Sequence, residues 1–127
     1  MIVVDASLAL SALLSDGPAR RVLATERLHA PHLVDHEVAS GLRRKSLAGQ
    51  IEDSSAVAAL RTWQRMGINR YPGFPLLERV WELRQNVSAY DASYVALAEL
   101  LDCALVTGDA RLARAPGIRC VTTVVPG

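Results

Sequence analysis

The sequence predicts an α/β fold in which a central, mainly parallel sheet is covered by helices on both faces. Two short apolar runs, Ile2-Val3-Val4 and Ala104-Leu105-Val106, have no polar side and therefore predict fully buried strands. Segments with apolar residues at helical spacing alternate with the strand segments, as in parallel α/β proteins. With 127 residues, half of them apolar, we expect a single domain over residues 1–127 with one core.

Turn formers and helix caps set most of the expected boundaries. Gly49 is a plausible stop for a helix, Asp53 or Ser54 is a plausible cap for the next, and Trp63 lies on that helix's apolar stripe. Trp63 is expected in the core, with a contact to a second copy of the chain or to another partner as the alternative. The expected elements are a strand over 2–5, helices from 7 to the break at 16–18 and over 19–27, a weak strand over 29–31, helices from 35 to 49 and from 53 or 54 to 67, a strand over 68–71, helices from 75 and from 88 to 101, a strand over 103–106, a short helix over 109–113 and a strand over 118–125.

Four acidic residues occupy positions that such a fold brings together. Asp5 and Asp109 follow the two buried strands, and Glu37 and Asp91 lie in the first turns of two expected helices. Ligands of open α/β sheets bind outside the carboxyl ends of the strands, so we expect these carboxylates to share one pocket. Clustered carboxylates repel one another, and a hard divalent cation such as Mg²⁺ or Mn²⁺ relieves that repulsion. The pattern indicates a metal-dependent enzyme.

Each acid also has a purely structural interpretation. Asp5 and Asp109 suit helix N-caps, Asp91 suits a capping box begun by Ser88, and Glu37 is favoured by the helix dipole. Taken singly, these interpretations explain most of the four. Taken together, the acids favour chemistry, because both buried strands end on an aspartate and capping does not require charge at all four places. Two nearby ions would activate a water and stabilise the leaving oxygen in phosphodiester cleavage.

Neighbouring polar residues suggest supporting roles. The hydroxyls of Ser7 and Thr107, each two residues from an acid, either orient the carboxylates and a metal-bound water or serve as turn and cap residues. Glu37, Gly41 and Arg44 share nearly one helical face, because seven residues make about two turns. Gly41 leaves room for a backbone to approach, and Arg44 is a candidate for holding a substrate phosphate.

Composition excludes some classes and leaves others open. The net charge is +1, and all but one of the 14 basic residues are arginines, which suits a nucleic-acid or acidic partner but also follows from a coding bias. Cys103 and Cys120 lack metal or redox spacing and predict buried thiols of a reducing compartment, with a disulfide possible only if their strands are neighbours. No apolar run reaches the roughly 18 residues of a membrane span, and no charged leader precedes Asp5, so a cytoplasmic protein is expected.

Four segments of the chain resemble the PIN-domain ribonucleases, and within that family the VapC-type toxins of toxin–antitoxin pairs. The segments are Ile2-Val3-Val4-Asp5-Ala6-Ser7, His36-Glu37-Val38-Ala39 with Leu42-Arg43-Arg44, Tyr90-Asp91-Ala92-Ser93-Tyr94-Val95-Ala96-Leu97-Ala98, and Leu105-Val106-Thr107-Gly108-Asp109. The third segment and the Thr-x-Asp are the most specific. The resemblance implies a PIN-like three-layer α/β/α sandwich.

The resemblance also implies an activity. Asp5, Glu37, Asp91 and Asp109 would be the catalytic, metal-coordinating acids of a Mg²⁺- or Mn²⁺-dependent endoribonuclease that hydrolyses RNA by metal-activated water. It further implies a homodimer and a VapB-like antitoxin encoded upstream. The chain departs from the family in two places, because relatives commonly carry Asn where Ser40 stands, and some carry a further acid within the segment 111–114, which has none.

Three other functions compete with this one. A Mg²⁺-binding receiver-like regulatory domain would need an early acidic pair and a lysine at a late strand end, whereas Lys45 is the only lysine and lies in an expected helix. A haloacid-dehalogenase-like phosphatase would need an acid at position 7, where Ser7 stands. A catalytically silent PIN module that only binds a partner remains an alternative, which the intact set of four acids disfavours.

Overall fold

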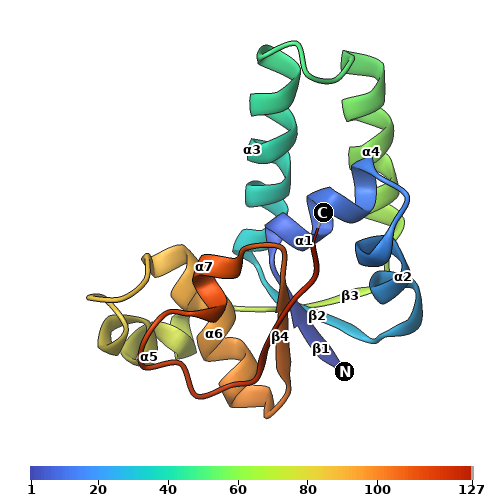
Figure 1. Ribbon diagram of the computed structural model, residues 1–127. Coiled ribbons are helices and arrows are strands. Elements are labelled where there is room, and N and C mark those ends of the chain that lie inside the picture. Colours follow the sequence, from blue (N-terminus) through green and yellow to red (C-terminus); the bar gives the residue numbers. More distant parts are fainter. Residues whose placement is uncertain (127) are drawn as a thin grey trace.

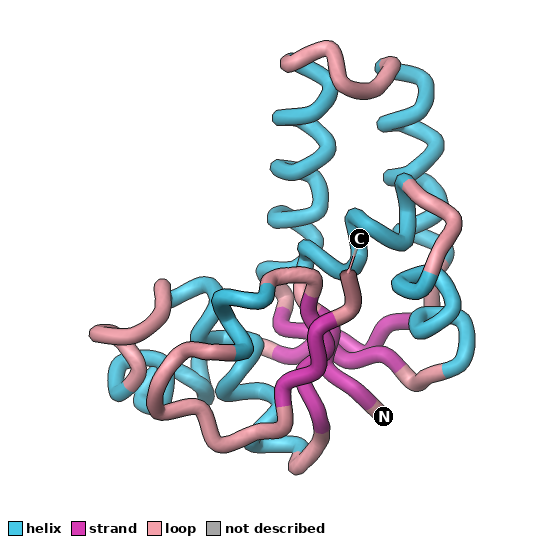
Figure 2. Tube along the Cα trace, viewed as in Figure 1, coloured by secondary structure: helices cyan, strands magenta, loops and turns pink. Residues whose placement is uncertain are grey.

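Five parallel strands form the centre of the molecule, in the order β3-β2-β1-β4-β5. The computed structural model describes residues 1–126. Its elements in chain order are β1 (Ile2–Val4), α1 (Ala6–Leu14), α2 (Pro18–Thr25), β2 (Leu28–Pro31), α3 (Leu33–Leu47), α4 (Asp53–Arg65), β3 (Ile68–Tyr71), the 3-10 helix η1 (Phe74–Leu76), α5 (Leu77–Glu82), α6 (Ala89–Leu101), β4 (Ala104–Thr107), α7 (Ala110–Ala113) and β5 (Thr122–Val124). Figure 1 labels these elements, and Figure 2 shows the strands gathered between two groups of helices.

The helices cover both faces of the sheet. Helix α6 packs against β1, β2 and β4, with α5 beside it, while α1 and α2 lie together on the other side (Figure 1). The buried faces meet in one hydrophobic core, in which Val3, Leu8, Leu97 and Leu105 have no exposed surface. The fold is therefore a three-layer α/β/α sandwich, which confirms the predicted class.

The centre of the sheet contains a reversal of strand order. Ile2 of β1 pairs with Leu28 of β2 on one side and with Ala104 of β4 on the other. The chain thus builds β2 and β3 outward from one edge of β1 and returns to add β4 and β5 at the opposite edge. Such a reversal leaves a crevice outside the carboxyl ends of the two strands that flank it, where ligands of α/β proteins bind. Asp5 stands at this end of β1.

Helices α3 and α4 form an antiparallel pair that projects from the body of the molecule (Figures 1 and 2). Asp35 fastens the base of this pair, because its carboxylate accepts hydrogen bonds from Trp63 Nε1 at 2.8 Å and from Arg70 Nε at 2.8 Å. The Arg70 guanidinium holds the pKa of Asp35 below its usual value. Trp63 is only 2 % exposed, so it belongs to the core and the alternative of a partner contact is wrong.

Several predicted boundaries were wrong for tertiary reasons. Helix α3 begins at Leu33, which places Glu37 in the second turn rather than the first. Asp53 is the first helical residue of α4 and caps nothing; its Oδ1 instead accepts a hydrogen bond from Ser46. The final strand is shorter than predicted, because residues 116–119 are bonded to α5, α6 and the segment between these helices.

Other predictions hold at the level of whole elements. Gly49 lies just after α3 with a φ of 71°, the left-handed conformation that a helix-ending glycine supplies. Cys103 and Cys120 are free thiols that are only partly buried, so their predicted place in the core was wrong. In the part of the chain that the structure describes, no helix has the length and apolar character required to cross a bilayer.

Candidate functional site

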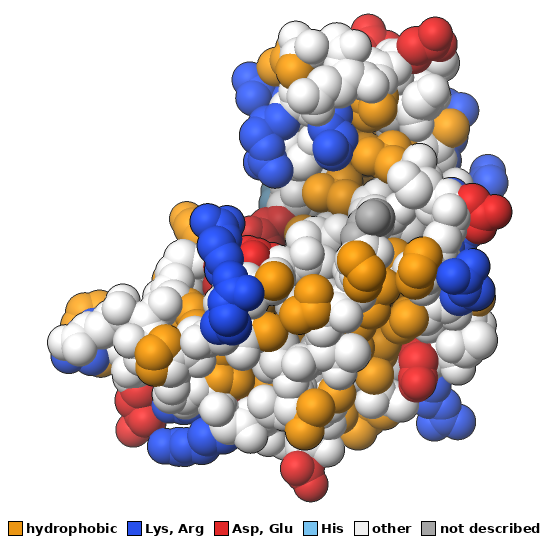
Figure 3. Space-filling view, viewed as in Figure 1, with side chains coloured by type: hydrophobic (Ala, Val, Ile, Leu, Met, Phe, Trp, Pro, Cys, Tyr) orange, Lys and Arg blue, Asp and Glu red, His pale blue; other side chains and the backbone are white. Residues whose placement is uncertain are grey.

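The four acids that the sequence singled out line one pocket of about 250 Å³. Each comes from a different place in the fold: Asp5 follows β1, Glu37 lies on α3, Asp91 begins α6 and Asp109 follows β4. The space-filling view shows acidic side chains in a recess between basic groups over α7 and over α3 (Figure 3). The remaining lining residues are Ala6, Ser7, Leu10, Ser40, Arg44 and Tyr94.

Asp5 is the most buried of the four, with 4 % of its surface exposed. Its Oδ1 accepts a hydrogen bond from Ser7 Oγ at 2.7 Å and from the Leu8 amide at 3.0 Å, so the carboxylate caps α1. Its Oδ2 accepts from Thr107 Oγ1. Burial nevertheless raises the pKa of Asp5 above its ordinary value, and the negative charge of Asp109 adds to that rise. The capping interpretation and the site interpretation therefore hold for the same side chain.

Thr107 joins two of the acids. The residue is completely buried at the end of β4, where its hydroxyl donates to Asp5 and accepts a 3.0 Å hydrogen bond from the amide of Asp109. One residue later, the amide of Gly108 donates to Ser7 Oγ at 2.9 Å. A Cβ at Gly108 would lie 3.2 Å from that hydroxyl, so the close approach of the two segments favours glycine. Both predicted supporting residues thus contact the carboxylate of Asp5 directly.

Glu37 reaches the pocket from α3 and meets Tyr94 of α6. The Tyr94 hydroxyl donates to Glu37 Oε1 at 2.5 Å, and Tyr94 itself is 1 % exposed. Burial raises the pKa of Glu37, the Tyr94 hydrogen bond opposes that rise, and the charges of Asp91 and Asp5 add to it. The pKa of Tyr94 is also raised, first by burial and then by Glu37, so the phenol stays protonated and acts as the donor.

Asp91 and Asp109 complete the acidic set. Ser88 caps α6 by accepting a 3.1 Å hydrogen bond from the Asp91 amide, which directs the first turn of that helix at the pocket. Burial raises the pKa of Asp91, and the charges of Asp5 and Asp109 raise it further. Asp109 caps α7 by accepting from the Arg111 amide at 2.9 Å. The predicted capping roles of Ser88 and Asp109 are therefore present alongside the shared pocket.

The predicted phosphate contact, Arg44, lines the same pocket from α3. Its Nη1 donates to Ser40 Oγ at 3.1 Å, one helical turn earlier, and its charge lowers the pKa of Glu37. Gly41 has a different role from the predicted one. A Cβ there would come within 2.3 Å of Leu10 Cδ1, so the absence of a side chain lets α1 pack on α3 and does not open the helix to substrate.

The donor set fits a hard divalent cation. Carboxylates and hydroxyls surround the pocket, with neither thiols nor imidazoles among its lining residues. Within residues 1–126, no group of three His, Cys, Asp or Glu side chains is arranged to hold an ion. Mg²⁺ keeps several of its waters and binds through only one or two carboxylates, and a pocket of about 250 Å³ has room for such a hydrated ion.

Sequence reasoning missed two residues that shape this site. Tyr94 follows Asp91 by three positions, so the helical repeat alone places both on one face of α6. Leu10 follows Ser7 by the same interval on α1. Helical spacing could have identified Tyr94 and Leu10. Their partners, Glu37 and Gly41, could not be predicted, because those contacts depend on how α3 packs against the other helices.

Comparisons with known proteins bear on the family and the fold of the chain. A family model described as "PIN domain" matches residues 2–118. The chain is 59 % identical over 126 residues to "Ribonuclease VapC9" of Mycobacterium tuberculosis, covering 99 % of both chains. Among solved structures, the crystal structure of VapC20 from Mycobacterium tuberculosis, described as a "Sarcin-Ricin loop cleaving toxin", is similar with a TM-score of 0.69 at 21 % identity, over 94 % of this chain and 97 % of the VapC20 chain. A toxin-antitoxin complex from Klebsiella pneumoniae has a TM-score of 0.71 at 20 % identity over the full length of both chains.

Proposed function

Because the chain belongs to the PIN-domain family, we propose that it is a metal-dependent endoribonuclease and acts as the toxin of a VapBC-type toxin–antitoxin pair. One observation carries the proposal: four carboxylates from separate elements meet in one pocket at the strand-order reversal. The relative that is 59 % identical over nearly its whole length is called a ribonuclease, which supports the same activity here. The reaction would be hydrolysis of an RNA phosphodiester bond.

The carboxylates favour a Mg²⁺ or Mn²⁺ ion at this place. Asp5, Glu37 and Asp91 all have a raised pKa, so their ionised forms are costly until positive charge arrives. Asp5, Glu37, Asp91 and Asp109 would hold the ion, one or two of them directly and the others through its waters, and the ion would supply a nucleophilic water and charge stabilisation for the leaving oxygen. Ser7 and Thr107 would keep the Asp5 carboxylate in one orientation, and Arg44 would bind a phosphate of the RNA.

The competing functions lack matching features. A receiver-like domain would place a lysine at the acidic pocket, and no lysine is among the residues that line it. A catalytically silent PIN module would retain the fold without needing four carboxylates at energetic cost. The three raised pKa values show that this cost is present, which favours the enzyme.

We propose the family's regulatory context as well. A VapB-like antitoxin, encoded upstream, would bind and silence the enzyme, as the toxin-antitoxin complex of similar fold from Klebsiella pneumoniae suggests. A homodimer and a cytoplasmic location, where RNA and antitoxin are made, follow from the same proposal. Light scattering of the purified chain tests the dimer, because a monomeric mass across the working concentration range would contradict it.

Expression in cells tests the toxin role. Inducing the wild-type chain alone should stop growth, whereas Asp91→Asn, which keeps the shape of the side chain and removes its charge, should be harmless at the same soluble level. Co-expression of the upstream neighbour should restore growth, and the neighbour should co-purify with the chain. Normal growth with soluble wild-type protein would contradict the toxin assignment.

A further inference from the structure

Helix α7 places an arginine beside the acidic pocket that the proposed chemistry does not use. The helix begins immediately after Asp109, and Arg111 Nε lies 3.4 Å from Asp109 Oδ1. The side chain of Arg111 is 86 % exposed. It therefore stands at the edge of the pocket, free to meet a ligand.

The fold does not depend on the charges of Arg111 and Arg114. An ion pair as exposed as that of Arg111 contributes little to stability, and the Asp109 carboxylate already caps α7 through the Arg111 amide. Arg114 follows three residues later, so the two side chains lie on neighbouring positions of one helical turn. Arg114 is exposed, and within residues 1–126 its side chain makes no hydrogen bond or ion pair.

Basic side chains lie on both sides of the acidic recess, over α3 and over α7 (Figure 3). Arg44 lines the pocket from α3, whereas Arg111 belongs to α7 and Arg114 is the residue that ends it. Four carboxylates and one divalent ion leave a net negative charge in the pocket, which repels a phosphate backbone, so cations on both sides would favour a polyanion there. Arg44 alone supplies them on one side only.

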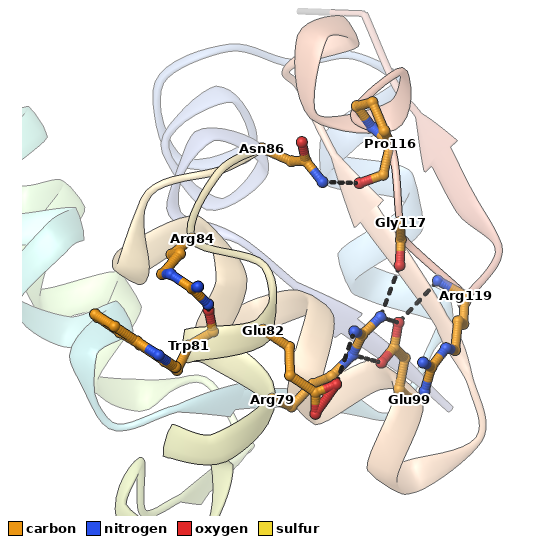
Figure 4. Close-up of polar contacts among 9 residues, drawn as sticks. All are labelled: Arg79, Trp81, Glu82, Arg84, Asn86, Glu99, Pro116, Gly117 and Arg119. Carbon is orange, nitrogen blue, oxygen red and sulfur yellow. Dashed lines mark hydrogen bonds and ion pairs between the residues drawn. The ribbon is translucent and has the colours of Figure 1, made fainter.

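The segment that follows α7 is fastened to the body of the molecule (Figure 4). Arg79 Nη2 donates to the Gly117 carbonyl at 2.7 Å, and Asn86 donates to the Pro116 carbonyl at 3.0 Å. Glu99 accepts from Arg79 Nε at 2.7 Å and from the Arg119 amide at 2.8 Å. With Asp109 fixed at the other end by Thr107, α7 is held at both ends, which lowers the entropic cost of binding through its side chains.

We propose that Arg111 and Arg114 bind the phosphates of the RNA on the side of the pocket opposite Arg44, so that the strand lies across the acids between α3 and α7. This inference rests on the proposed ribonuclease function and names further residues that would bind the RNA substrate. In this role the segment 111–114, where some relatives carry a further acid, supplies substrate binding instead.

The test compares charge-neutral variants in a cleavage assay and a binding assay. Arg111→Gln with Arg114→Gln should raise KM about tenfold while kcat changes by less than about threefold, because a phosphate contact outside the reacting bond acts on binding. Binding of a labelled RNA oligonucleotide, measured in an Asp91→Asn background over several salt concentrations, should lose about two units of salt slope in the double variant. Arg21→Gln, an exposed arginine on α2, is the matched control and should change neither quantity.

The outcomes separate this inference from the function on which it rests. A wild-type protein that does not cleave RNA would overturn the proposed function. Cleavage by the wild type, with KM and salt slope in the double variant equal to those of Arg21→Gln, would overturn the inference alone. So would a loss of kcat at unchanged KM, or a loss of antitoxin binding with RNA binding intact, because the α7 arginines would then serve the reacting bond or a protein partner.

Discussion

The hydroxyl of Tyr94 donates a 2.5 Å hydrogen bond to Glu37 Oε1 and so connects α6 to α3 at the acidic pocket. Tyr94→Phe removes only this donor. Because a hydrogen bond to a charged group contributes about 1.5–3 kcal/mol, the unfolding free energy at neutral pH should fall by about that amount. The difference from wild type should shrink on acidification, since protonated Glu37 gains less from the donor. Urea unfolding at several pH values measures both effects.

Tyr90→Phe is the control for that variant, because Tyr90 belongs to the same helix but is 65 % exposed. It should leave stability within about 0.5 kcal/mol of wild type, as exposed substitutions do. Equal losses in the two variants would show that the Tyr94 hydroxyl does not stabilise ionised Glu37.

Thr107 supplies a second test of how the site is held. Thr107→Val keeps the shape and removes the hydroxyl that bonds Asp5 and the Asp109 amide, while Thr107→Ser keeps the hydroxyl and removes a methyl group. The valine variant should lose about 1–3 kcal/mol of stability because polar groups are left unsatisfied, and the serine variant about 0.5–1.5 kcal/mol because of the small cavity left by the methyl group. Only the valine variant should lose most of its RNA cleavage. Equal kcat values in the two would contradict an orienting role for the hydroxyl.

Asp91 gives a test of the electrostatics that needs no activity. Its pKa is raised in the folded protein, so the folded state binds the proton more tightly than the unfolded state does. Stability from this group is therefore present at acidic pH and is lost as pH rises through its folded pKa. Asp91→Asn should gain melting temperature relative to wild type as pH rises from about 4 to 7 in a chelator. Added Mg²⁺ should stabilise the wild type more than the variant. A difference independent of pH and of metal would contradict the account.

The two cysteines test the register at the sheet edge. Leu105 of β4 pairs with Thr122 of β5, and extending this register by two residues, beyond the start of both strands, would place Cys103 opposite Cys120. Neighbouring strands are about 4.8 Å apart, which is within the Cα separation of disulfides. Burial raises the pKa of both thiols, so alkylation at neutral pH should be slow, whereas diamide should join them within one chain. Mass spectrometry, with Cys120→Ser as the control, identifies the product. Disulfide-linked dimers without an intramolecular disulfide would contradict this register.

Most of the site could be predicted from the sequence, because its acids lie next to recognisable strands and helices. Asp5 and Asp109 follow buried strands, and the rule that parallel strands end at one edge brings them together. Contacts that depend on how helices pack could not be predicted from neighbouring residues in the sequence. Examples are the Tyr94 hydrogen bond to Glu37 and the packing of Leu10 on Gly41, which depend on where α3 lies. The length of β5 could not be predicted either, because Gly117 and Arg119, which precede it, are hydrogen-bonded to Arg79 and Glu99 of distant helices.

The most direct test of the central claim is cleavage of RNA by the purified protein with and without divalent metal. Wild type should cut an RNA substrate in Mg²⁺ or Mn²⁺, stop when EDTA is in excess, and recover when the metal is restored. Asp91→Asn, purified in the same way to control for contaminating nuclease, should be inactive in both conditions. Undiminished cleavage by the wild type in excess EDTA, with Asp91→Asn inactive, would contradict the metal-dependent site formed by Asp5, Glu37, Asp91 and Asp109.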